Sequence, residues 1–178
     1  TIDPLSGVEQ DFTTPVIYTV TSESGSTKSW TVTVNEEAPP SITWANLQWP
    51  ADGNITLNQS FNVYAQVYAE SITNIAGQGA GIQAWIGYST ENTDPGTWTN
   101  WIAASFQGDN GNNDEYLADL GASIGTAGIY YYASRFQLDE QAFVYGVFQG
   151  GFCDGNNNIS GTLTVNPPPF KNLTISVV

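Results

Sequence analysis

Aromatic side chains alternate with amide side chains along several segments of this chain, and this combination suits the recognition of neutral sugars. Within residues 60–69, Asn62 and Gln66 alternate with Tyr64 and Tyr68. A pyranose face carries axial C–H groups that stack on rings, while the equatorial hydroxyls need hydrogen-bonding groups at the rim. One stacked sugar removes about 80 Å² of apolar surface from water, worth about 2 kcal/mol before ordering costs. The alternative is that these rings are ordinary strand residues that cover their neighbours.

Trp85 is the strongest single candidate for a stacking platform. Neighbouring side chains of a strand point to opposite faces of the sheet, so residues 81–89 divide into two sets. One set is apolar and consists of Ile82, Ala84, Ile86 and Tyr88. Trp85 and Gln83 belong to the other set, where Gly87 leaves room for a sugar ring.

Further candidates come from two other segments. Trp98 and Trp101 are three residues apart, so one of them is expected in the core and the other at the surface. Within residues 128–138, Tyr131 and Arg135 lie on the less apolar face. Arg135 is the only cation of residues 41–165, and it either pairs with a carboxylate or donates hydrogen bonds to ligand hydroxyls. The candidate carbohydrate-binding residues are Trp85, Trp98, Trp101, Tyr131, Arg135, Gln83 and Tyr64.

Two other tryptophans lie in or directly after the first expected strand of this region. Trp44 lies within it, and Trp49 precedes Pro50 and the Asp52-Gly53 turn signal. We expect Trp49 and Pro50 to plug one end of the sandwich rather than to bind a ligand.

The elements that must position these side chains are strands. Period-2 alternation rich in Val, Ile, Thr, Tyr and Phe recurs between Gly and Pro turn signals, and no stretch has a helical period. The expected strands are residues 16–22, 28–34, 41–48, 60–69, 81–89, 98–106, 115–119, 128–138, 142–148 and 161–165. The pattern predicts an all-β protein built as an antiparallel β-sandwich of the Ig-like or carbohydrate-binding-module type.

Two proline-rich segments divide the chain. Residues 36–40 (EEAPP) and 166–169 (NPPP) each follow a strand pattern that the prolines end. We therefore expect part of an Ig-like spacer at 1–35, a β-sandwich module at 41–165, and a linker or the start of another module at 166–178. The two strands within the first segment form a hairpin, which is marginal alone in water.

Composition excludes several classes of function. The 178 residues contain 3 Lys and Arg against 17 Asp and Glu, a net charge of −14 that repels nucleic acid and anionic lipid. The absence of His rules out Ser-His-Asp, Cys-His and His-zinc sites within this chain. Cys153 has no partner or activating base nearby, and no apolar run approaches a membrane span. The first residues lack a signal-peptide pattern, so we expect a mature fragment or an excised module.

Two polar loops, residues 107–115 and 150–158, either cradle calcium or border a ligand groove. Asp114 and Glu115 are adjacent and point apart on a strand, so they do not form an acid and base pair. No cofactor is expected, and no pair of carboxylates is marked as catalytic.

Two resemblances extend this interpretation. The segments YTVT at 18–21 and WTVTV at 30–34 resemble the second half of the Ig-like repeats of Bacteroidetes surface glycan-binding lipoproteins, which implies a stalk. The segments GIQAWIGY at 81–88, WTNW at 98–101, NNDEY at 112–116 and GIYYYASRF at 128–136 resemble accessory β-sandwich domains of secreted Bacteroidetes proteins. Those proteins include polysaccharide-degrading and nuclease-type enzymes.

These observations predict a non-catalytic, multimodular protein that holds a neutral polysaccharide for polysaccharide utilisation, secreted or at the bacterial outer-membrane surface. β-1,3-Glucan of the laminarin type is favoured and starch-like α-glucan comes second, because both chains are curved. Its expected partners are the polysaccharide and further modules of the same polypeptide, with no nucleic acid and no direct membrane insertion. The alternatives are a structural Ig-like spacer or adhesion module, and an accessory domain of a secreted hydrolase.

Overall fold

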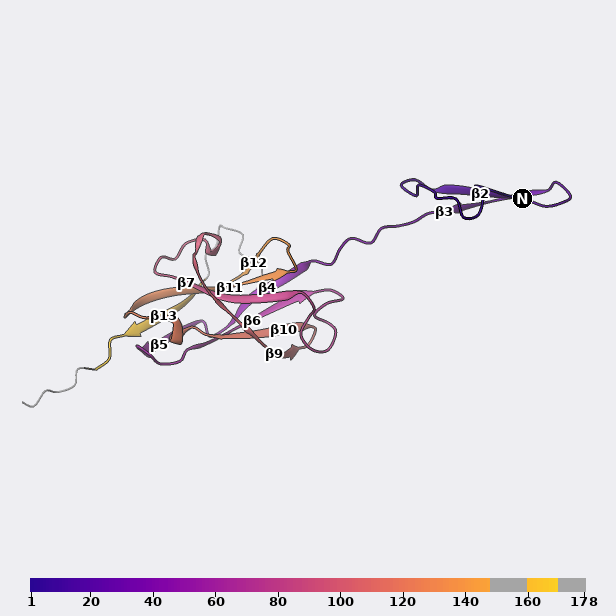
Figure 1. Ribbon diagram of the computed structural model, residues 1–178. Coiled ribbons are helices and arrows are strands. Elements are labelled where there is room, and N and C mark those ends of the chain that lie inside the picture. Colours follow the sequence, from indigo (N-terminus) through magenta and orange to yellow (C-terminus); the bar gives the residue numbers. More distant parts are fainter. Residues whose placement is uncertain (148–159, 170–178) are drawn as a thin grey trace, which may run out of the picture. The chain divides into compact units, whose positions relative to one another are not determined.

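The computed structural model describes residues 1–147 and 160–169, which fold as two compact units, Thr1–Pro39 and Pro40–Val178 (Figure 1). Each unit is described by itself. The expected loop at 150–158, Cys153, the last residue of the expected strand 142–148 and the last nine residues of the expected third segment lie outside the described residues.

The first unit is a three-stranded antiparallel sheet in the order β1 (Ile2–Asp3), β2 (Val16–Thr21), β3 (Thr27–Val32). A turn at Gly25, whose φ of 81° favours glycine, joins β2 to β3. None of the residues 1–39 is buried, and Trp30 is 54% exposed. The unit therefore forms strands without burying a core of its own.

The second unit is a sandwich of two sheets, which confirms the all-β prediction (Figure 1). The four-stranded sheet has the order β4 (Ile42–Trp49), β6 (Asn62–Ala69), β10 (Asn113–Asp119), β9 (Ser105–Asn110). The six-stranded sheet has the order β5 (Asp52–Thr56), β13 (Gly161–Asn166), β11 (Gly128–Leu138), β7 (Ile82–Ser89), β8 (Asn100–Ala103), and β12 (Val144–Gly146) pairs with β11. Two short 3-10 turns, η1 (Pro95–Thr97) and η2 (Gly121–Ser123), lie between strands.

The core lies between the two sheets because each strand sends alternate side chains inward. β6 contributes Val63, Ala65, Val67 and Ala69, and β7 contributes Ile82, Ala84 and Ile86. Tyr132 of β11 is fully buried and its hydroxyl donates to the Pro50 carbonyl oxygen at 2.7 Å. The Ser134 hydroxyl donates to the Asn46 carbonyl oxygen at 2.8 Å and so ties β11 to β4. This inward packing fixes which side chains of β7 and β11 face out.

Two sequence expectations need correction. The strand β5 lies where a turn was expected, and it forms a parallel pair with β13 instead of an antiparallel one. The expected loop at 107–115 is mostly a β-hairpin of β9 and β10, which turns at Gly111 with a φ of 65°. The strand β5 forms because its pairing with the distant β13 overrides the local turn signal. In the hairpin the turn signal is confined to the turn itself, and the flanking residues of β9 and β10 pair with each other.

Candidate functional site

The outer face of the six-stranded sheet carries a cluster of aromatic side chains around one arginine. In the register, Arg135 of β11 lies between Trp85 of β7 and Tyr145 of β12. Trp101 of β8 lies opposite Gly87, two residues along β7 from Trp85. We call the group formed by Trp85, Trp101, Arg135, Phe143 and Tyr145 the platform.

Arg135 is held by rings. Its guanidinium carbon lies 4.2 Å from the centroid of the Phe143 ring, 4.3 Å from that of Trp101 and 4.9 Å from that of Trp85. Cation–π contacts of this kind are worth about 0.5 to 2 kcal/mol each. The sequence left open a carboxylate partner or ligand hydroxyls. Among the described residues the guanidinium lies against three aromatic rings, and hydrogen bonding to ligand hydroxyls stays a prediction.

The electrostatics of Arg135 follow from this setting. Burial lowers the pKa of its guanidinium, while the charge interaction and hydrogen bond with Tyr145 oppose that shift. The Nε atom is buried without a hydrogen-bond partner among the described residues. Arginine stays protonated under such conditions, so the platform has a fixed positive charge at its centre.

Trp101 lies across the sheet over Gly87. A Cβ atom on Gly87 would lie only 2.6 Å from two carbon atoms of the Trp101 ring. The sequence expectation that Gly87 leaves room for a sugar ring is therefore wrong, because the indole of Trp101 fills that room. Trp101 donates from Nε1 to the Trp98 carbonyl oxygen at 3.0 Å, which fixes the orientation of the ring.

Trp98 packs against Trp101 and is itself buried. It is 8% exposed, its ring centroid lies 6.2 Å from that of Trp101, and its Nε1 donates to the Thr93 hydroxyl at 3.1 Å. Of the two tryptophans, Trp98 is thus the buried one and Trp101 the partly exposed one. A direct ligand contact through the face of Trp98 is not available in this arrangement.

Phe143 and Tyr145 complete the platform and were not singled out from the sequence. The Phe143 ring stands edge-on to Trp85 at 5.6 Å and is 39% exposed, and the Tyr145 ring lies 5.8 Å from Trp101. Both residues occupy alternate positions of the expected strand 142–148, so the same alternation that indicated Trp85 was the available signal.

The other three predicted binding residues lie outside the platform. Tyr131 is on the outer face of β11, opposite Ser89, and is partly exposed. Gln83 is exposed two residues before Trp85 and lies opposite Gln137. Tyr64 is on β6 of the other sheet and is not part of the platform.

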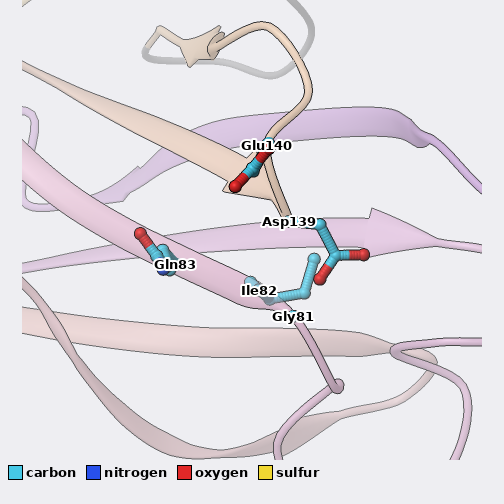
Figure 2. A pocket seen from close by; sticks show the side chains of 5 residues that line it. All are labelled: Gly81, Ile82, Gln83, Asp139 and Glu140. Atoms are coloured by element: carbon cyan, nitrogen blue, oxygen red, sulfur yellow. The ribbon is translucent and has the colours of Figure 1, made fainter.

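A pocket lies at the end of the platform face, where β7 begins and β11 ends. Figure 2 shows its lining residues, Gly81, Ile82, Gln83, Asp139 and Glu140. The Asp139 amide donates to the Gly81 carbonyl oxygen at 2.9 Å and so holds the two strand ends together, and Gly81 has a φ of 80°. Its two carboxylates are neighbours in the chain, and no aromatic ring lines it. The platform is therefore better suited to sugar stacking than this pocket.

The carboxylates of the β9–β10 hairpin hold a neighbouring loop. Asp109 accepts hydrogen bonds from the Gly77 amide at 3.0 and 3.1 Å, and Asp114 accepts one from the Gly79 amide at 2.7 Å. Asp114 is fully buried, and burial raises its pKa despite the Gly79 hydrogen bond. Within the described ranges, no three acidic or cysteine side chains cluster as a metal site would require.

Comparisons with known proteins associate the chain with carbohydrate-active proteins. Residues 1–34 match the family model described as SGBP, N-terminal, where SGBP denotes a surface glycan-binding protein. An amylopullulanase of Thermoanaerobacter thermohydrosulfuricus is 29% identical over 144 residues, covering 70% of this chain. An amylopullulanase of Thermoanaerobacterium saccharolyticum is 33% identical over 99 residues, covering 44%. The chain spans 10% and 8% of the length of these relatives.

The matches are consistent with a carbohydrate-binding accessory module. The match to a surface glycan-binding family agrees with an extracellular or surface location. Among the described residues, no helix is both long and apolar enough to cross a membrane.

Proposed function

We propose that the second unit is a non-catalytic module that binds a neutral polysaccharide on the platform. The observation that carries the proposal is the grouping of Trp85, Trp101, Phe143 and Tyr145 around Arg135 on one outward sheet face. These rings offer apolar faces to sugar C–H groups, and the Arg135 and Tyr145 side chains offer hydrogen-bonding groups to hydroxyls. About two or three stacked sugars give affinities in the micromolar to millimolar range.

We favour a starch-like α-glucan over laminarin as the ligand. The relatives are named amylopullulanases, and that name refers to amylose-type chains and pullulan, which are α-glucans. The sequence analysis placed β-1,3-glucan first and starch-like α-glucan second, and chain curvature supports both of them equally. In this proposal the module keeps an α-glucan at the bacterial surface, or close to a hydrolase elsewhere in the same or a partner polypeptide.

Affinity electrophoresis tests the proposal. The protein is run through native gels that contain amylopectin, pullulan, laminarin, xylan, mannan or alginate. We expect retardation by the α-glucans, and Trp85→Ala is expected to weaken the apparent affinity by at least about tenfold, or about 1.4 kcal/mol. The thermal midpoint is measured beside it, because a buried core tryptophan would instead cost about 3 to 5 kcal/mol of stability. A structural spacer predicts no retardation in any gel, and retardation by laminarin alone would contradict the α-glucan assignment.

A further inference from the structure

The outer side of the four-stranded sheet carries a second set of aromatic and amide side chains. Because Val63, Ala65 and Val67 of β6 point into the core, Tyr64 and Gln66 point outward. Cross-strand neighbours on β4 and β10 add to them. We call this set the second face, and it consists of Trp44, Trp49, Tyr64, Gln66, Tyr68 and Glu115.

Trp49 is the most exposed tryptophan of the sandwich unit, with 60% of its surface open to solvent. The sequence expectation that it plugs the sandwich end is wrong, and only its neighbour Pro50 is buried. A β-bulge between Leu47 and Trp49 shifts the register, so Trp49 lies opposite Tyr64. The two ring centroids are 6.0 Å apart and the rings are tilted by 52°. An exposed indole held beside a tyrosine by the backbone is an open stacking surface.

Fixed polar groups lie beside these rings. Gln66, which is 6% exposed, donates from Nε2 to a Glu115 carboxylate oxygen at 3.3 Å and accepts from Asn113 Nδ2 at 3.4 Å. The Gln66 backbone amide donates to the side-chain oxygen of Asn46 at 3.0 Å. These hydrogen bonds hold the remaining acceptor sites of Glu115 and Asn46 in place, where hydroxyl groups of a ligand can donate to them.

The dimensions of the second face suit an oligosaccharide. Tyr64 and Tyr68 are four residues apart on β6, a span of about 13 Å along the strand, enough for about two or three sugar rings. Tyr68 lies opposite Trp44, so each end of this span carries a tryptophan and a tyrosine, with Gln66 between them. The platform has the same composition of rings with a polar centre.

We propose that the second face is a second binding site for neutral polysaccharide, so that the sandwich unit is bivalent. This inference rests on the proposed function, since it assigns the same ligand class to another surface. The two faces lie on the outer sides of different sheets of the sandwich, so they point away from each other. One short oligosaccharide therefore cannot contact both, whereas a branched or coiled polymer can reach both sites.

Bivalency has a measurable consequence. When one site is occupied, the other site meets the same polymer at high effective concentration, and the overall affinity rises by about 10²- to 10⁴-fold over one site. Loss of either site then lowers the affinity for polymer far more than the affinity for a short oligosaccharide at the other site.

The test compares Trp49→Ala, Trp85→Ala and the double variant in amylopectin-containing gels and by titration with maltoheptaose. Trp30→Ala is the matched control, because Trp30 is 54% exposed and lies in the first unit. We expect each single variant to lose at least about tenfold in amylopectin affinity, the double variant to lose all retardation, and the control to behave as wild type. Maltoheptaose titration of Trp85→Ala still reports binding, and this binding disappears in the double variant.

Three results separate the two proposals. Trp49→Ala with wild-type affinity, beside a Trp85→Ala variant that binds nothing, overturns the second site and leaves the platform standing. Trp85→Ala with wild-type affinity, beside a weakened Trp49→Ala, supports the second face and overturns the platform. Wild-type protein that sediments as a dimer, and Trp49→Ala protein that sediments as a monomer with unchanged glycan affinity, identifies the second face as a self-association surface and overturns the inference.

Discussion

Replacing Gly87 by alanine tests how Trp101 is seated on the platform. The new Cβ would lie 2.6 Å from two ring carbons of Trp101, whereas packed carbon atoms lie about 3.5 to 4.0 Å apart. The ring must therefore move outward by about 1 Å. That movement strains the Trp101 hydrogen bond to Trp98 and the contact between Trp101 and Arg135.

The expected cost of Gly87→Ala is about 1 to 3 kcal/mol of unfolding free energy, as for other overpacked sites. For a domain of this size, each kcal/mol lowers the thermal midpoint by about 4 °C. Because Trp101 is a platform residue in our proposal, we also expect amylopectin affinity to fall by at least about tenfold, measured well below the midpoint.

Gly128→Ala is the matched control. Gly128 is exposed at the start of β11, and an added Cβ would lie 3.6 Å from its nearest neighbour, an ordinary contact. We expect unchanged affinity and an unchanged or slightly higher midpoint, because glycine in a strand costs about 0.5 to 1 kcal/mol relative to alanine. If Gly87→Ala retained both the wild-type midpoint and the wild-type affinity, the seating of Trp101 over Gly87 would be refuted.

Further predictions concern charge. Arg135→Lys keeps the charge but loses the planar stacking on three rings, so calorimetry should show a loss of about 1 kcal/mol and titration a weaker glycan affinity. Burial raises the pKa of Asp114 and so favours its protonated form in the folded protein. The stability that this form contributes is present below the ordinary pKa of aspartate and is lost as pH rises through the raised pKa. The midpoint of Asp114→Asn should therefore improve relative to wild type as pH rises above the ordinary pKa of an aspartate, with nearby Asp109 adding to the effect. Burial alone would raise the pKa of Asp119, but hydrogen bonds from the Phe61 and Ala122 amides outweigh it and lower the pKa. The thermal midpoint of Asp119→Asn should therefore fall relative to wild type as pH rises. Glycan affinity should be nearly independent of salt concentration because the ligand is uncharged, and a steep dependence would indicate a charged polymer.

Alternation along strands is the part of this fold that the sequence predicts well. Because side-chain direction in a strand depends only on parity, the inward positions of β6 and β7 and the outward direction of Trp85 follow from local pattern. Parity alone does not show which of Trp98 and Trp101 is buried and which is exposed. That depends on the 3-10 turn η1, which ends just before Trp98 and sets the strand phase that follows.

Long-range packing accounts for what the sequence does not predict. Gly87 and Trp101 are neighbours only through the pairing of β7 with β8, so the filling of the space over Gly87 has no local signal. Trp49 points outward because a β-bulge adds one residue to β4 and so reverses the side-chain alternation after Leu47. The residue types around the bulge give no signal of it in the sequence. Arg135 meets Phe143 only because β12 returns beside β11.

The central claim is that the platform receives a neutral glycan. The most direct measurement is a titration of ¹⁵N-labelled protein with maltoheptaose, in which the indole N–H signals are assigned by single Trp→Phe substitutions. The sequence has six tryptophans, and Trp30, in the first unit, serves as the internal reference. We predict saturable shifts of the Trp85 and Trp101 signals while Trp30 stays in place. Glycan binding that leaves the signals of Trp85 and Trp101 unmoved would contradict the claim.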